Sequence, residues 1–411
     1  MSRRLVLPVL LLASCQAYAT NGYYSHGYGV KSKAQGGVGI ALSEDALVIA
    51  SNPAGLVDVA DGYQLGVDVF LPSRGSELRQ GPSTASFDAD GTSRYFIPEI
   101  GYSRHIGRRV AVGIAVFGNG GLATDYENNP FARFGAQGSA GVDLSQAFIS
   151  PAIAVKVSET QSLGLAVNLG YQVFKAKGIG LFSGFSSSPA NVSDRGSDTA
   201  TGWGVRVGWT GHFGDKVTLG ATWQSKTEMG RFDKYRGLFA DRGGFDAPET
   251  YGLGISLRPI NKLTLALDWQ RILYNDVPTV GNSVASLFTG VPLGAPNGPG
   301  FGWQNVSVWK VGGNYVLNEA LTLRAGFSLS SQPIPSGETF FNILAPGVVR
   351  KHVTLGGTWS LNGKNEFSAS YLHAFKENVN GFGSIPAAFG GGEANIHLQE
   401  DSFGIAFSHR F

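Results

Sequence analysis

Cysteine is almost absent from this chain, since Cys15 is the only one among 411 residues. It lies in an N-terminal stretch that we expect to be removed, so the mature chain would form no disulfide. Beyond that stretch, no apolar run approaches the ~20 residues that a membrane-spanning helix needs. These two absences exclude a disulfide-stapled domain and a bundle of transmembrane helices.

Neither sign of charge predominates. The formal net charge is +2, and it becomes zero once the two arginines of the N-terminal stretch are removed. This balance gives no indication of nucleic-acid binding. None of the seven histidines stands beside a serine in a recognisable nucleophile motif, and no cluster has metal-ligand spacing. We therefore expect no enzyme, no catalytic residue, no metal site and no cofactor.

Residues 1–19 have the features of a secretory signal peptide. A basic pair is followed by the apolar run 5–13 and by a small-x-small site at 17–19. We expect cleavage after Ala19. The alternative is a lipoprotein signal, because residues 12–15 resemble a lipobox that ends in Cys15.

Glycine (59 residues) and aromatic side chains (11%) are abundant, and apolar and polar residues alternate in segment after segment. In 262–270, for example, leucines and a tryptophan occupy every second position. A period of two predicts strands with one apolar face and one polar face. We expect fourteen strands, near 64–72, 94–104, 108–117, 145–157, 162–175, 200–213, 215–228, 249–258, 262–273, 305–317, 320–331, 348–360, 364–376 and 397–411.

Short and long gaps alternate between these strands, which is typical of an outer-membrane barrel with short turns at one end and long loops at the other. A bilayer requires the sheet to close, because an open edge would leave backbone groups unpaired in hydrocarbon. The fold class is therefore all-β: a fourteen-stranded antiparallel transmembrane β-barrel formed by residues 61–411. The last strand ends in Phe411 and resembles the signal that the barrel assembly machinery reads, although His409 departs from the usual apolar residue.

Residues 20–60 precede the first strand and are too polar and glycine-rich to span a membrane. Fourteen strands enclose a lumen wider than their side chains can fill. We therefore expect this segment to form an N-terminal hatch, or plug, inside the barrel. Within it, residues 45–51 could form one short helix that Asn52 and Pro53 end. The alternative is a periplasmic tail that plugs nothing.

Three stretches resemble the long-chain fatty-acid transporter family of Gram-negative outer membranes, the FadL/TodX type. The opening stretch 21–56 ends in Asn52, Pro53 and Ala54, which match the family's hatch motif. Stretch 119–130 is similar to the segment after the family's third strand, where a kink opens the wall sideways. Stretch 232–255 has a loop and strand pattern of one branch of the family. The resemblance covers nearly the whole mature chain.

The resemblance implies a plugged barrel whose extracellular loops capture hydrophobic molecules, pass them to a luminal pocket and release them sideways into the bilayer. It implies a lateral exit at Gly118, Asn119, Gly120 and Gly121, where glycines suit a local loss of strand pairing. Ligand contacts are expected from two apolar loops and from inward-facing cations. The candidate ligand residues are Tyr23, Tyr24, Phe182, Phe185, Leu238, Phe239, Arg206, Lys310 and Arg324.

The resemblance favours long-chain fatty acids as substrates, with aromatic hydrocarbons as the alternative by the same route. A carboxylate partner in the lumen would favour fatty acids. The alternatives of a different class are a barrel enzyme acting on lipids, for which the residues show no nucleophile motif, and a general porin. The expected surroundings are outer-membrane lipid and lipopolysaccharide, and the expected state is a monomer.

Overall fold

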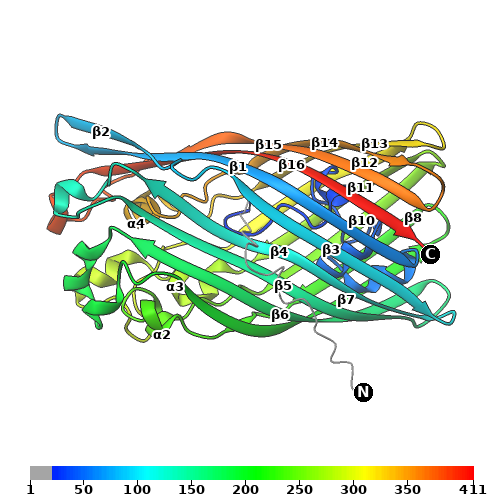
Figure 1. Cartoon of the computed structure of the whole chain (residues 1–411), viewed down its shortest axis with the longest axis horizontal. Helices are drawn as coiled ribbons and strands as arrows, with labels where there is room; N and C mark the ends of the chain where they lie inside the picture. The colour runs from blue at the N-terminus through cyan, green and yellow to red at the C-terminus, as the bar shows by residue number, and fades with distance from the viewer. Residues whose placement is uncertain (1–20) are drawn as a thin grey trace, which may run out of the picture.

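The computed structural model describes residues 21–411, so the predicted leader, its cleavage site and Cys15 lie outside the described residues. The described chain forms one antiparallel sheet that closes on itself, because the first strand pairs with the last. Figure 1 shows the resulting cylinder, with its strands inclined to the long axis. Fourteen strands form the wall, which confirms the predicted fold class.

All but two strands of the sheet belong to this wall. The wall strands are β1 (Gly62–Gln80), β3 (Tyr95–Ile106), β4 (Val110–Tyr126), β5 (Ala140–Lys156), β6 (Gln161–Lys177), β7 (Asp198–Phe213), β8 (Val217–Gln224), β10 (Thr250–Ile260), β11 (Leu263–Ile272), β12 (Val306–Val316), β13 (Leu321–Ser330), β14 (Lys351–Ser360), β15 (Asn365–Val379) and β16 (Glu393–Arg410).

The two remaining strands are β2 (Ser83–Asp88), which pairs with the far half of β1, and β9 (Glu228–Met229), which pairs with β7. The strand predicted near 64–72 is therefore longer than expected, and part of the long gap that follows it forms β2. β1 continues to Gln80 because its far half finds a partner on each side, β16 on one and β2 on the other.

The helices are all short. They are α1 (Val30–Lys33), α2 (Ala240–Gly243), α3 (Pro278–Gly281) and α4 (Thr339–Asn342), with the 3-10 helices η2 (Ala46–Ala50), η3 (Pro53–Asp58), η4 (Ala132–Phe134), η5 (Gly180–Phe185), η6 (Pro189–Asn191), η7 (Asp233–Tyr235), η8 (Tyr274–Asp276), η9 (Val284–Thr289), η10 (Ser336–Glu338) and η11 (Ala387–Phe389). Within the described range, no helix has the length and apolarity that crossing a bilayer requires.

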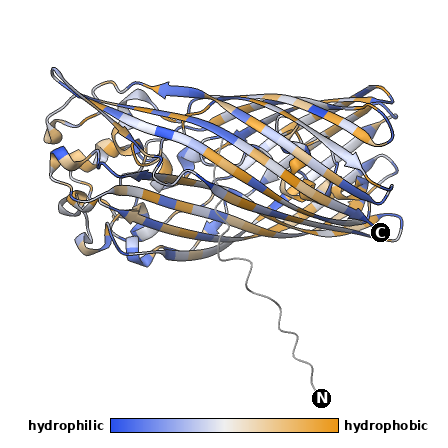
Figure 2. Cartoon of the chain, turned by 45° about the horizontal axis from the view of Figure 1, so that its top comes forward, coloured by the Kyte–Doolittle hydropathy of each residue, from blue (hydrophilic) through white to orange (hydrophobic). Residues whose placement is uncertain are grey.

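β11 illustrates how the alternating sequence produces the cylinder. Leu265 and Leu267 are 43% and 41% exposed on the outside, whereas Thr264, Ala266 and Asp268 are buried on the inside. Successive strand side chains point to opposite faces, so the period of two puts apolar residues toward lipid and polar ones toward the lumen. Figure 2 shows the same alternation along many strands. The loops that carry α2, α3 and α4 gather at one end in Figure 1, and the short turns and the C-terminus at the other.

Residues 21–61, here called the N-terminal segment, lie inside the cylinder (Figure 1). The Lys33 ammonium pairs with Asp68 on β1 and, at 2.5 Å, with Glu99 on β3. From a different side of the ring, the Asp268 carboxylate on β11 accepts a hydrogen bond of 2.8 Å from the backbone N–H of Gly39. The segment is therefore tied to the wall on more than one side.

The helix predicted just before Asn52 is present as the 3-10 helix η2. A second 3-10 helix, η3, begins at Pro53, where a missing N–H costs nothing. The Asn52 side chain caps it by accepting a hydrogen bond of 3.1 Å from the backbone N–H of Ala54. The Asn-Pro pair thus ends one helix and begins the next.

Candidate functional site

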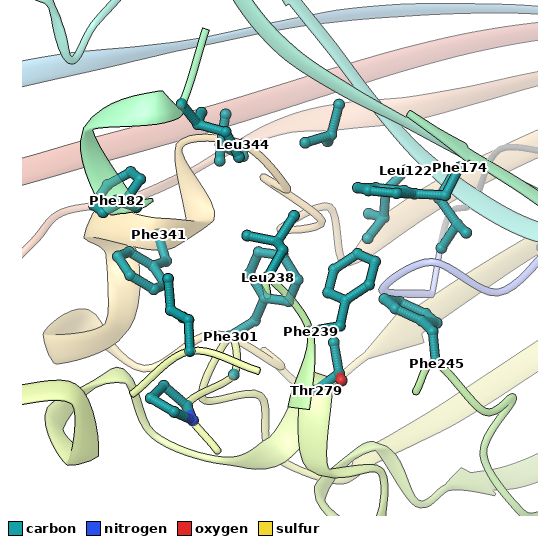
Figure 3. Close-up of a pocket in the computed structure, with 16 residues that line it drawn as sticks. Leu122, Phe174, Phe182, Leu238, Phe239, Phe245, Thr279, Phe301, Phe341 and Leu344 are labelled. Carbon is teal, nitrogen blue, oxygen red and sulfur yellow. The ribbon is translucent and has the colours of Figure 1, made fainter. Parts of the chain in front are cut away.

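An apolar pocket lies among the long loops, at the level where strands β4, β5 and β6 approach them (Figure 3). Its walls come from segments that are far apart in the sequence. The sixteen lining residues are Leu122, Val142, Leu144, Phe174, Ile179, Phe182, Leu238, Phe239, Phe245, Thr279, Leu293, Pro299, Gly300, Phe301, Phe341 and Leu344.

Thr279 is the only lining residue with a polar side chain, and its hydroxyl donates a hydrogen bond of 2.5 Å to the carbonyl oxygen of Gly244. The pocket thus offers a ligand a nearly all-apolar surface, and its one polar side chain is already hydrogen-bonded. The cavity volume is about 40 Å³. The space is therefore narrow, and a slender or flat ligand suits it best.

Aromatic rings contact one another along the pocket. The ring centroids of Phe174 and Phe239 lie 4.5 Å apart, and those of Phe239 and Phe245 lie 5.2 Å apart. Farther along, the rings of Phe182 and Phe341 are 5.0 Å apart. Most of these pairs are tilted or edge-on, so ring faces and edges are both available to an aromatic ligand.

Of the predicted loop residues, Phe182, Leu238 and Phe239 line this pocket, and Phe185 does not. The Phe185 ring instead packs against Phe389 at 5.7 Å and Phe288 at 6.4 Å. These three rings come from three different long loops. They form an aromatic cluster between the loops, beside the pocket.

The predicted tyrosines are near the pocket but behind its wall. Both are buried, and the Tyr23 ring lies 5.7 Å from that of Phe245, which lines the pocket. The backbone N–H groups of Tyr23 and Tyr24 donate hydrogen bonds of 3.1 and 3.2 Å to the Tyr274 hydroxyl. That hydroxyl donates one of 2.5 Å to the carbonyl of Asn21. Tyr274 therefore fixes the start of the N-terminal segment.

β4, the third wall strand, contains the irregularity that the sequence indicated. Its register against β5 shifts between Gly118 and Gly120, which leaves Asn119 as the extra residue of a β-bulge. A one-residue insertion exchanges the faces of the strand. Thus Phe117 contacts Tyr28 of the N-terminal segment before the bulge, and Leu122 lines the pocket after it.

The wall has a gap beside this bulge. Pairing between β3 and β4 stops at Ile100 opposite Val116, although β4 continues to Tyr126. We refer to the unpaired stretch between 95–99 of β3 and 117–124 of β4 as the exit window, after the lateral exit that the sequence resemblance implied there. Its far end is closed by the backbone N–H of Asp125, which donates a hydrogen bond of 2.9 Å to the Ala89 carbonyl.

The N-terminal segment covers the exit window from inside. The backbone N–H of Ser25 donates a hydrogen bond of 3.0 Å to Asn119, and the N–H of Gly121 donates one of 3.0 Å to Tyr23. These bonds replace part of the ladder that β3 would have supplied. A Cβ on Gly120 would lie 2.0 Å from the Tyr23 carbonyl oxygen, so only glycine permits this close approach.

The predicted hatch triplet, Asn52, Pro53 and Ala54, packs against the inner face of the wall at β6 and β7. The Asn52 amide donates hydrogen bonds of 3.0 Å to the Trp209 carbonyl and 2.7 Å to the Ile40 carbonyl. A Cβ on Gly208 or Gly164 would clash with Asn52 or Ala54, so the two surfaces are in close contact. This triplet fixes the N-terminal segment to the barrel.

The three predicted cations point inward but are not at the pocket. Arg206 donates a hydrogen bond of 3.1 Å to the Ser51 carbonyl. Arg324 forms an ion pair of 2.8 Å with Glu44. Burial would raise the pKa of Glu44, but the Arg324 guanidinium outweighs it and holds that pKa below its ordinary value.

The third cation, Lys310, is buried opposite Asp268 in the β11–β12 ladder. The structure thus brings Arg206, Lys310 and Arg324 to the N-terminal segment and its wall contacts, away from the apolar pocket.

Sequence reasoning missed the lysines of the N-terminal segment. Burial lowers the pKa of Lys33, but its neighbours Asp68 and Glu99 outweigh it and raise that pKa above its ordinary value. Lys31 pairs with Glu366 on β15 at 2.8 Å. The available signal was two lysines within a stretch of small and apolar residues, which only acidic partners on the wall can accommodate.

Comparison with known proteins identifies the family to which this sequence and fold are similar. Residues 11–411 match the family described as outer membrane protein transport protein (OMPP1/FadL/TodX). No curated protein matches the sequence significantly.

Among solved structures, the chain is similar to the Pseudomonas putida toluene transporter TodX, with 19% identity, TM-score 0.69, and coverage of 94% of this chain and 99% of that one. A Pseudomonas aeruginosa FadL homologue gives 16% identity, TM-score 0.69, and coverage of 95% and 100%. The Ralstonia pickettii toluene transporter TbuX gives 18% identity, a TM-score of 0.65, and coverage of 94% of this chain and 99% of that one. At these identities the likeness shows a shared fold.

Proposed function

Because the chain belongs to the OMPP1/FadL/TodX family of outer-membrane transport proteins, it is an outer-membrane channel for hydrophobic compounds and not an enzyme, and we propose that it carries small neutral aromatic hydrocarbons. The observation that carries this proposal is that none of the sixteen pocket-lining residues is charged. A neutral hydrocarbon gives up no hydrogen bond or ion pair when it enters this pocket. A carboxylate would be buried in apolar surroundings without a partner, at a large cost in free energy.

Two further observations support an aromatic ligand. The narrow space and the paired rings suit a flat molecule, and each ring contact of good geometry contributes about 0.5–1.5 kcal/mol beyond the burial of area. In addition, TodX and TbuX are each described as a toluene transporter.

Long-chain fatty acids, which the sequence favoured, are the second candidate. An alkyl chain in the same pocket would gain about 0.8 kcal/mol per buried CH₂. The head group is the difficulty, because Arg206 and Arg324 already hold the N-terminal segment. A fatty acid would therefore have to bind with its carboxylate outside this pocket.

The proposed route begins at the aromatic cluster of the extracellular loops, continues through the pocket and leaves through the exit window into the bilayer. A side exit keeps the ligand out of water, where its apolar surface is least favourable. The N-terminal segment acts as the hatch: it blocks the lumen along the barrel axis and covers the window until its first residues move.

A binding experiment on purified protein tests the substrate class. Titration calorimetry in one mild detergent would compare toluene with dodecanoate for the wild type, Phe239→Ala and Phe382→Ala. Phe239 lines the pocket, whereas Phe382 is 80% exposed in a loop and is the matched control.

We expect toluene to bind the wild type and to bind Phe239→Ala about 5–10-fold more weakly, with no change for Phe382→Ala. Binding of dodecanoate alone, or equal loss of toluene binding in both variants, would overturn the assignment.

A further inference from the structure

A second, smaller pocket lies beside the exit window. It shares Leu122 with the large apolar pocket, and it includes Gly121 at the bulge and Gly22 of the N-terminal segment. Arg74 on β1 and Glu400 on β16 complete its polar side. This pocket, here called the window pocket, borders the large pocket at Leu122 and the exit window at Gly121 and Ala123, so it lies on the proposed route.

Arg74 is not available to such a ligand. It is buried, and its guanidinium reaches across the end of the exit window to β4, where Nε donates a hydrogen bond of 2.5 Å to the Ala123 carbonyl. Its other N–H groups also have acceptors within the protein. These are the carbonyls of Pro72 and Thr92, the carboxylate of Asp90 and the hydroxyl of Tyr95.

Glu400 is in the opposite situation. Its side chain is 2% exposed, and Oε2 has no hydrogen-bond partner among residues 21–411. A buried polar atom without a partner costs stability, so such atoms are rare and point to a ligand or another function. This one lines a pocket that lies on the route.

We infer that Glu400 is a specificity-determining residue of the channel, which accepts a hydrogen bond from a hydroxyl or amino substituent on an aromatic ligand in the window pocket. The inference rests on the proposed route from the large pocket to the exit window. The large pocket then selects for the apolar ring, and Glu400 selects for a single donor on it. A ligand donor that satisfies this buried oxygen removes the cost of leaving it without a partner.

The same residue disfavours acids. A ligand carboxylate in the window pocket would lie beside the Glu400 carboxyl, and two such groups cannot both ionise there without mutual repulsion. The fully engaged Arg74 cannot compensate. The two pockets together therefore favour phenols and anilines over benzoates of the same size.

Three ligands with the same methyl-substituted ring and different para substituents test this inference: toluene, 4-methylphenol and 4-methylbenzoate. Their dissociation constants would be measured by titration calorimetry for the wild type, Glu400→Leu, Glu400→Gln and Glu77→Gln. Glu77 is on β1 outside the window pocket and serves as the control. Heat-modifiable migration on gels would confirm that each variant is folded.

In the wild type we expect 4-methylphenol to bind about tenfold more tightly than toluene, and 4-methylbenzoate to bind more weakly than either. Glu400→Leu should abolish the advantage of the phenol without changing toluene binding by more than about twofold. Glu400→Gln keeps an acceptor oxygen but adds an NH₂ group that cannot accept, so it should retain about a third of that advantage. Glu77→Gln should match the wild type.

If the wild type binds toluene but shows no preference for the phenol, or if the preference persists in Glu400→Leu, the inference is wrong while the proposed function stands. If the wild type binds neither neutral ligand, the proposed function itself fails. Should Glu400→Leu not fold, an undiminished phenol preference in Glu400→Gln would count against the inference.

Discussion

The side-chain amide of Asn52 donates a hydrogen bond of 3.0 Å to the main-chain carbonyl of Trp209, which joins the N-terminal segment to β7 across the lumen. The same amide also binds the Ile40 carbonyl, so one side chain holds two parts of the segment and the wall together. Residues 157 positions apart in the sequence are thereby fixed to each other.

Replacing Asn52 with alanine should loosen the hatch without unfolding the barrel. The change removes several buried hydrogen bonds and an N-cap, at a cost of about 1–3 kcal/mol to the docking of the segment. We expect faster swelling of proteoliposomes in arabinose than with the wild type. Asn362→Ala, in an exposed turn, is the control, and equal swelling of all three proteins would contradict an anchoring role for Asn52.

Replacing Tyr274 with phenylalanine should release the first residues of the N-terminal segment. The ring stays in place, but the hydroxyl that binds Asn21, Tyr23 and Tyr24 is lost. We expect the amide of Tyr23 to exchange with deuterium at least tenfold faster. Tyr315→Phe, on the outer face of β12, should leave this exchange unchanged.

Deleting Asn119 should remove the bulge and straighten β4, which would bring residues 117–124 toward β3 and narrow the exit window. Gly118 and Gly120 would then be consecutive opposite Ala147 and Gln146, so the ladder with β5 would become continuous. Because residues after the bulge keep their faces, Leu122 should still line the pocket. We expect toluene binding to persist and uptake into whole cells to fall about tenfold or more; unchanged uptake would exclude the window as the exit.

Lowering the pH should loosen the N-terminal segment, because His26 becomes protonated. Burial, reinforced by nearby His352, Lys310 and Lys33, lowers the pKa of His26 below its ordinary value of about 6.5. A released His26 therefore binds protons more readily than a docked one, so docking is complete above about pH 6.5 and weakens as the pH falls below it. Glu44, whose pKa is lowered, contributes docking free energy that is lost only under more acidic conditions.

Swelling of proteoliposomes in arabinose between pH 7.5 and 5 measures this effect. The rate should rise as the pH falls in the wild type and should vary little in His26→Asn. His409→Asn, near the end of β16, should keep the wild-type profile. A His26→Asn profile that follows the wild type would assign the acid response to other groups.

The wall strands were predictable because each carries its own alternating pattern, as β11 does, and that pattern depends only on which face meets lipid. The hairpin formed by β1 and β2 was not predictable. The second half of β1 lies beyond the lipid-facing zone, and there both faces of the strand carry polar residues such as Arg74 and Glu77. The bulge in β4 was recognisable from its glycines, whereas the continuation to Tyr126 depends on pairing with β5 that no local pattern shows.

The pocket was only partly predictable. Phe182, Leu238 and Phe239 stood out as apolar residues in long loops, but Phe174 on β6 and Phe341 on α4 reach the same space only through the fold. Alternation correctly put Arg206 and Arg324 inside. It could not show that the N-terminal segment would occupy them, because the pairing of Arg324 with Glu44 joins residues 280 positions apart.

The ring closes through the seam between β1 and β16, which runs from Gly62 opposite Arg410 to Arg79 opposite Glu393. Residues 21–61 lie within that closed ring and are bonded to strands on several sides of the lumen. While the seam stays paired, this stretch can therefore leave the barrel only along its axis and never sideways through the wall.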